Sequence, residues 1–98
     1  MRHFATVVIG GGAAGIMAAG VAASRGGNVL LCERMEKPQR KVRITGKGRC
    51  NLTNLCSEEE FLAKVRCGAD FFASALHRFD SEATMRFFER IGVPLTVE

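Results

Sequence analysis

The sequence predicts an α/β fold that begins with a strand–helix–strand unit and continues into a long loop and a group of helices. Residues 6–9 form an apolar, β-branched run that suits a strand buried on both faces of a parallel sheet. Residues 10–15 hold four glycines, and an alanine-rich segment follows them. A second apolar run, residues 28–32, ends at Glu33, which completes the order strand, glycine turn, helix, strand and acid.

The glycine turn has the spacing Gly-x-Gly-x-x-Gly. Gly10 makes the tight turn, Gly12 admits a pyrophosphate, and Gly15 lets the helix approach the sheet. The free N–H groups and positive dipole end of the following helix suit phosphates. Glu33 follows at the distance typical of an acid that accepts from ribose hydroxyls. We therefore predict a dinucleotide site rather than a purely structural turn, formed by Gly10, Gly12, Ala13, Ala14, Gly15 and Glu33.

The first unit is expected to span residues 5–33, with two parallel strands at 5–9 and 28–33 and a helix at 13–25. The dipeptide Gly26-Gly27 should end that helix. Residues 34–56 show no sustained period, so we predict a polar loop that wraps around a ligand.

Residues 57–92 are expected to form a helical segment. Ser57 and Glu60 make a capping box for a first helix, and Asp80 or Ser81 should cap the last one. Gly92 and Pro94 end the segment, and residues 94–98 are predicted to start a further strand. The phenylalanines of these helices are interpreted as core residues.

The net charge of +4 is unevenly distributed. Half of the fourteen basic residues lie within residues 34–49, where Glu36 is the only acid. Such a cluster favours a polyanion. A pyrophosphate explains it without a second ligand, and nucleic acid is disfavoured because no aromatic residues are interleaved and the chain has no Tyr or Trp.

Residues 4–24 carry no charge, yet their glycines and alanines give too little hydrophobicity for a membrane or secretory segment. We therefore expect a cytoplasmic protein that has no membrane partner. The four cysteines match no zinc spacing, so no metal site is predicted and the cysteines are expected to be thiols.

A second motif covers residues 45–54 and reads Thr-Gly-Lys-Gly-Arg-Cys-Asn-Leu-Thr-Asn. Together with the glycine turn, Glu33 and Arg40-Lys41, it resembles the BaiN-like flavoproteins, a family of NAD(P)/FAD-dependent oxidoreductases. The resemblance covers nearly the whole chain. The Gly-Arg-Cys-Asn-x-Thr-Asn part is far more specific than the glycine turn, which many families share.

The resemblance implies the N-terminal part of a Rossmann-like FAD-binding domain in a longer flavoenzyme. It implies FAD, with its adenosine ribose at Glu33 and its pyrophosphate over residues 12–15. Gln39 and Lys47 depart from the family, which has glycine there: Gln39 puts the local turn in question, and Lys47 adds a charge suited to a phosphate. The cofactor residues predicted beyond the glycine turn are Glu33, Arg34, Arg40, Lys41, Gly48, Arg49, Cys50 and Asn51.

The function expected from this resemblance is hydride or electron-pair transfer between FAD and an organic small-molecule substrate, with NAD(P)H or oxygen as the open choice of redox partner. Catalytic residues remain unassigned. Cys50 is a weak candidate for a redox-active thiol, because five residues separate it from Cys56 where disulfide-reductase flavoproteins have four.

Three alternatives remain open at this stage. They are an NAD(P)-dependent dehydrogenase or reductase without flavin, a basic nucleic-acid-binding module, and a non-catalytic remnant. An incomplete sheet would expose a strand edge. The isolated chain is therefore expected to associate with the remainder of its own longer chain or with itself.

Overall fold

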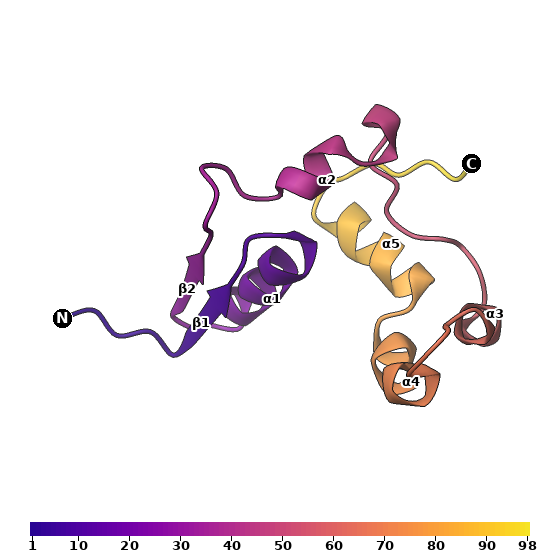
Figure 1. Cartoon of the computed structure of the whole chain (residues 1–98), viewed down its shortest axis with the longest axis horizontal. Helices are drawn as coiled ribbons and strands as arrows, with labels where there is room; N and C mark the ends of the chain where they lie inside the picture. The colour runs from indigo at the N-terminus through magenta and orange to yellow at the C-terminus, as the bar shows by residue number, and fades with distance from the viewer. The chain divides into compact units, whose positions relative to one another are not determined.

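The computed structural model describes residues 1–98 (Figure 1). The chain consists of two compact units, Met1–Asn51 and Leu52–Glu98. The elements of the first unit are β1 (Thr6–Ile9), α1 (Ala13–Ser24), β2 (Val29–Cys32), α2 (Arg40–Ile44) and the 3₁₀ helix η1 (Gly46–Gly48). Those of the second unit are α3 (Glu58–Ala63), α4 (Ala69–Arg78) and α5 (Ser81–Arg90).

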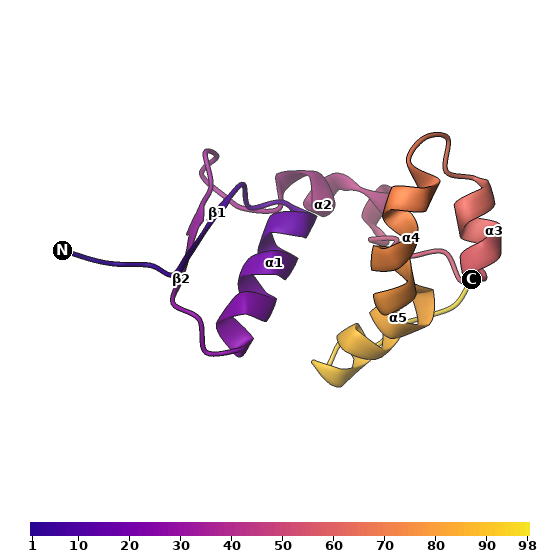
Figure 2. The same ribbon diagram turned by 90° about the horizontal axis from the view of Figure 1, so that it is seen from below.

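The first unit is built on the predicted strand–helix–strand arrangement. β1 and β2 pair in parallel, with Thr6 opposite Val29 and Ile9 opposite Cys32. α1 packs beside both strands, as Figures 1 and 2 show. The turn after α1 is closed by the N–H groups of Gly26 and Gly27, which donate to carbonyls of the last helical turn. The α/β class and the stop at Gly26-Gly27 are therefore confirmed.

The burial of β1 differs from the prediction. Val7 is 52 % exposed and Ile9 is 80 % exposed, so the strand is not buried on both faces. Two strands and one helix provide too little surface to cover both sides of the pair. The apolar run predicts the strand correctly, but its burial depends on neighbours that this unit lacks.

The segment predicted as a polar loop contains two short helical elements, α2 and η1. A helix of five residues is too short to produce a visible hydrophobic period, which explains why the sequence pattern missed it. Three residues other than glycine adopt the left-handed backbone conformation here: Gln39 (φ 57°), Lys47 (φ 50°) and Cys50 (φ 54°). Gln39 immediately precedes α2, so a sharp turn exists there although the residue is not glycine.

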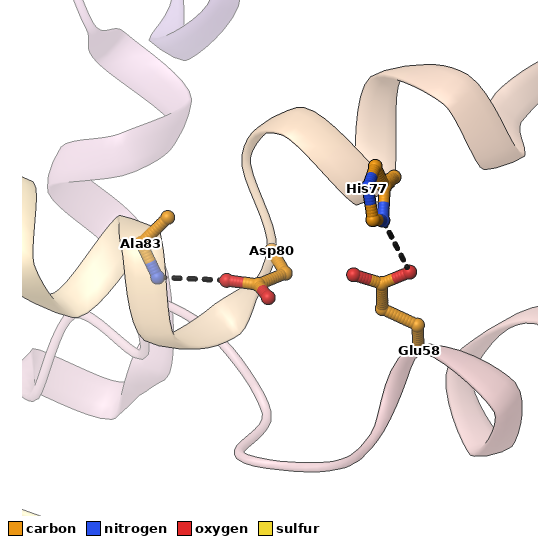
Figure 3. A network of polar contacts seen from close by, with 4 residues as sticks. All are labelled: Glu58, His77, Asp80 and Ala83. Carbon is orange, nitrogen blue, oxygen red and sulfur yellow. Dashed lines mark hydrogen bonds and ion pairs between the residues drawn. The ribbon is translucent and has the colours of Figure 1, made fainter.

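The caps of the second unit are those that the sequence predicts. Ser57 Oγ accepts from the N–H of Glu60 at 3.1 Å and donates to its carboxylate at 3.2 Å. Asp80, rather than Ser81, caps α5, because its carboxylate accepts from the N–H of Ala83 at 2.8 Å (Figure 3). Gly92 ends α5 with a φ of 96°.

The helices α3 and α4 lie side by side (Figure 2) and are bridged by a polar contact at the surface. His77 Nδ1 lies 3.3 Å from a carboxylate oxygen of Glu58 (Figure 3). The Phe61 and Phe72 rings also meet across this pair, with centroids 5.8 Å apart. His77 therefore has a structural partner in Glu58.

The core of the second unit is much smaller than the sequence suggests. Only Leu76 is a buried hydrophobic residue, and Ser81 is the only buried polar one. Phe71 is 92 % exposed, and Phe72 and Phe79 are also exposed, so the prediction that the helical phenylalanines form a core is wrong for these three residues. Short helices give each ring few neighbours, so aromatic contacts form without full burial. Residues 94–98 form no strand, because a strand needs a partner for its backbone groups.

A test of the turn uses two glycines of α1. A Cβ on Gly15 would lie 1.8 Å from the carbonyl oxygen of Gly10, whereas a Cβ on Gly20 would meet nothing within 4 Å. Gly15→Ala should therefore destabilise the fold by about 3 kcal/mol, and Gly20→Ala should stabilise it by about 1 kcal/mol. Urea unfolding of the full polypeptide that the gene encodes measures both changes, and equal effects would contradict the predicted close approach.

The left-handed residues provide a second test. Replacing Gln39 or Lys47 by glycine should raise the free energy of unfolding by about 0.5 kcal/mol, because relief of left-handed strain exceeds the entropy cost of glycine. Lys41→Gly, inside α2, should instead lower it by about 1 kcal/mol. The same unfolding measurement applies, and destabilisation by all three changes would show that positions 39 and 47 are not strained.

Candidate dinucleotide-binding site

The glycine turn joins the end of β1 to the start of α1. Gly10 has a φ of 101°, and its N–H donates to the carbonyl of Cys32 at 2.7 Å, which keeps the turn beside the end of β2. A Cβ on Gly12 would meet no protein atom within 4 Å. Protein packing therefore does not require glycine at position 12, whereas the predicted close approach of a pyrophosphate would require it.

The N-terminus of α1 is free to bind an anion. Gly12 is its N-cap and supplies no side chain to the first turn, and the first turn contains no acidic residue. The N–H groups of Ala13, Ala14 and Gly15 come before the first intrahelical bond, which Ile16 makes to Gly12 at 3.0 Å. These groups and the helix dipole point at one place, which suits a phosphate.

A buried glycine within the turn holds three segments together. The N–H of Gly11 donates to Glu33 Oε1 at 2.8 Å, and its carbonyl accepts from the N–H of Gln39 at 2.7 Å. A Cβ on Gly11 would lie 3.2 Å from both Glu33 and Pro38, so a larger residue would push them away. We call this arrangement of Gly11, Glu33 and Gln39 the Gly11 clamp.

Gly11 is a variable position of the Gly-x-Gly-x-x-Gly motif, so the sequence pattern predicts no role for it. The signal that could have revealed it is the third consecutive glycine, since the motif alone does not require one at this place. Its two partners lie far away in the sequence, so no local pattern indicates them.

The Glu33 carboxylate has a structural task in addition to the predicted ribose contact. Its second oxygen accepts from the N–H of Met35 at 2.6 Å. The hydrogen bond from Met35, then that from Gly11, and the nearby charge of Arg34 hold the pKa of Glu33 below its ordinary value. Each carboxylate oxygen retains a lone pair after these bonds, so Glu33 can still accept from a ribose hydroxyl.

The basic residues that follow β2 are exposed. Arg34 is next to Glu33, and Arg40 and Lys41 form the first turn of α2. Arg43 donates from Nε to the carbonyl of Pro38 at 3.3 Å. A shallow pocket of about 270 Å³ is lined by Met35, Glu36, Lys37, Arg40 and Arg43.

Residues 48–51 form a tight turn that is held by its own backbone. The N–H of Arg49 donates to the carbonyl of Gly46 at 2.9 Å, and a Cβ on Gly46 would lie 2.9 Å from the backbone nitrogen of Asn51. The structure thus brings together the glycine turn, Glu33 and the start of α2. The hydrogen bond from Arg49 ties residues 48–51 to Gly46 in η1.

Cys50 is exposed, and all four cysteines are free thiols, as the sequence predicts. Among the helices, none has both the length and the apolar character needed to cross a bilayer.

Comparison with known proteins identifies relatives of this chain. Residues 4–98 match the family model described as the HI0933-like protein Rossmann domain. The chain is 42 % identical over 79 residues to the ribosomal RNA dihydrouridine synthase of Escherichia coli strain K12. The aligned region covers 81 % of this chain and 19 % of that protein. It is also 40 % identical over 90 residues to the 3-dehydro-bile acid delta(4,6)-reductase of Clostridium scindens. That aligned region covers 88 % of this chain and 21 % of that protein.

The chain spans about a fifth of the length of both curated relatives. The family match extends over nearly all residues and agrees with the observed β1–α1–β2 unit. The family match and the bile acid reductase relative together confirm the resemblance to the BaiN-like flavoproteins that residues 45–54 indicated. The chain belongs to the HI0933-like Rossmann-domain family.

Proposed function

We propose that this chain is the FAD-binding N-terminal part of a flavin-dependent reductase. The observation that carries the proposal is the uncapped N-terminus of α1 at Gly12, where a Cβ would meet no protein atom. A carboxylate, Glu33, lies at the end of the neighbouring strand. A dinucleotide needs these two features, an anion site and a ribose acceptor, at the carboxyl ends of adjacent parallel strands.

The chain's own residues would hold the cofactor in separate parts. The N–H groups of Ala13, Ala14 and Gly15 would bind the diphosphate, and the remaining lone pairs of Glu33 would accept from the ribose. Arg40 and Lys41 would add positive charge, and residues 48–51 are proposed to lie along the cofactor. When bound, FAD supplies the hydride carrier that no amino-acid side chain provides.

The activities after which the two relatives are named suggest the class of reaction. Dihydrouridine is a uridine whose C5–C6 double bond is saturated, and a delta(4,6)-reductase of a 3-dehydro-bile acid acts on double bonds that lead to a ketone. Each of these double bonds is conjugated with a carbonyl group, either directly or through the neighbouring double bond. We therefore propose reduction of such a bond, in which a hydride adds to one carbon and a proton to its neighbour, with NADH or NADPH as the source of the two electrons.

The proposal leaves two substrate classes, a uridine in RNA and a small steroid. A nicotinamide-dependent enzyme without flavin is the competing cofactor assignment, because the glycine turn and Glu33 serve either dinucleotide. A redox-active role for the Cys50 thiol is still a prediction.

The cofactor assignment is tested on the full polypeptide that the gene encodes. The purified protein should have a flavin absorption spectrum, and heat should release FAD in a ratio close to one per chain. Release of a nicotinamide dinucleotide instead, with no FAD uptake on addition, would contradict the proposal.

The role of Glu33 is tested by Glu33→Gln. The glutamine amide can accept only with its oxygen, so it cannot receive both the Gly11 and Met35 N–H groups at two oxygens. FAD affinity should fall at least about tenfold. Glu36→Gln, a matched change at an exposed acid, should leave the affinity unchanged; an equal loss in both variants would indicate a general charge effect.

The same variant gives a pH test. The pKa of Glu33 is lower in the folded protein than in the unfolded chain, so the ionised carboxylate stabilises the fold above its ordinary pKa. This contribution is lost as the pH falls through the acid range toward the lowered pKa. The stability of the wild-type protein should therefore fall more steeply on acidification than that of Glu33→Gln, and parallel profiles would argue against the ionised clamp.

A further inference from the structure

The Glu33 carboxylate is held in one orientation by the protein itself. Its Oε1 accepts from the N–H of Gly11 at 2.8 Å, and its Oε2 accepts from the N–H of Met35 at 2.6 Å. A glutamate side chain without such bonds samples several rotamers, and fixing one of them when a ligand binds costs free energy. Because the two donors hold different oxygens, that cost is already met, and the carboxylate is a preorganised acceptor.

Among the three consecutive glycines, Gly11 is the one that protein packing requires. It is buried, and a Cβ there would lie 3.2 Å from the Cβ and Oε1 atoms of Glu33 and from the Cβ of Pro38. A Cβ on Gly10 or Gly12 would meet nothing within 4 Å. The φ angle of Gly11 is not positive, so lack of space rather than backbone conformation excludes a side chain. A side chain at position 11 would therefore displace the proposed ribose acceptor.

The backbone groups of Gly11 are unavailable to the proposed phosphate site at the N-terminus of α1. Its N–H is bonded to Glu33, and its carbonyl is bonded to the N–H of Gln39. Gly11 can therefore act on a bound ribose only through Glu33, whereas Gly12 would act through the close approach of the diphosphate. Two adjacent glycines thus serve different parts of one dinucleotide.

We propose that Gly11 is a positioning residue that sets the preference of this site for a ribose with free hydroxyl groups, an inference that rests on the proposed function. Its N–H orients the Glu33 carboxylate, and the lone pairs that remain on that carboxylate accept from the hydroxyls. An acceptor that is already oriented loses little conformational entropy when the hydroxyl binds, so the hydrogen bond contributes more to affinity.

The test uses the full polypeptide that the gene encodes, freed of flavin by dialysis, and two ligands. One is FAD, and the other is a FAD analogue that carries dideoxyadenosine in place of adenosine. Calorimetric titration gives both dissociation constants, and we call their ratio the ribose preference. The wild-type protein should prefer FAD at least about tenfold, the usual effect of a hydrogen bond to a charged acceptor. Gly11→Ala should reduce the preference to about threefold or less, because the displaced carboxylate no longer meets the hydroxyls.

Two controls separate positioning from general damage to the fold. A partly unfolded protein binds both ligands more weakly by the same factor, so the ribose preference does not change. Gly12→Ala should weaken both ligands and keep the wild-type preference. In a protein that already carries Glu33→Gln, adding Gly11→Ala should not change the preference further, since the carboxylate through which Gly11 acts is absent. A further fall there would contradict the proposed route.

A measurement on the wild-type protein needs no substitution at Gly11. Hydrogen exchange of the flavin-free protein, resolved to single residues, should show slower exchange of the Gly11 amide than of the Gly12 amide. The Gly11 N–H is bonded to Glu33, whereas the N–H of Gly12 makes no hydrogen bond within the protein. Equally fast exchange of both amides would overturn the inference even where Gly11→Ala folds poorly.

FAD uptake by the wild-type protein separates the two proposals. Normal uptake without a ribose preference, or with a preference that Gly11→Ala leaves intact, would overturn the positioning role of Gly11 alone. A wild-type protein that takes up no FAD would overturn the proposed function and this inference with it. The expected result is normal uptake, with a ribose preference that is lost in Gly11→Ala and kept in Gly12→Ala.

Discussion

The local structure of the first unit depends on the two backbone hydrogen bonds of Gly11. One fixes its N–H to the Glu33 carboxylate, and the other fixes its carbonyl to the N–H of Gln39. These bonds join the glycine turn to the end of β2 and to the residue that precedes α2. Because α1 begins two residues after Gly11, the direction in which its free N–H groups point depends on the same bonds. The clamp therefore links the proposed ribose acceptor to the proposed phosphate site.

Hydrophobic burial contributes little to this order. In the whole chain only Leu76 and Ser81 are buried side chains, and both belong to the second unit. The first unit is held by the β1–β2 ladder, the packing of α1 and the clamp. The side chains of Val7 and Ile9 are exposed to water. Exposed apolar surface of this kind is where other protein segments usually pack. Polar bonds thus define the site, whereas burial of its strands needs additional partners.

The sequence predicted the features that depend on nearby residues. The strand–helix–strand order and the caps at Ser57 and Asp80 follow from local patterns, and the structure contains all of them. It did not predict the clamp, because Gly11 and Glu33 are 22 positions apart and their bond has no periodic signature. Nor did it predict the exposure of Phe71, since an apolar residue on a helix is buried only where another element covers it. Of the predicted cofactor residues, the structure assembles those around the glycine turn, whereas residues 48–51 form a turn of their own.

The division between backbone and side chains suggests how one fold can serve relatives with different substrates. The proposed anion site at α1 consists of N–H groups and the missing side chain of Gly12, so it would recognise a diphosphate whatever the neighbouring side chains are. Among the cations that follow β2, Arg34 lowers the pKa of the Glu33 carboxylate, and the N–H of Arg43 donates to the carbonyl of Gln39 at 3.0 Å. Lys37, Arg40 and Lys41 are exposed and make no hydrogen bond to the clamp. They can therefore change without disturbing the turn. We therefore propose that backbone geometry fixes cofactor binding in this family, whereas replaceable side chains set the choice of substrate.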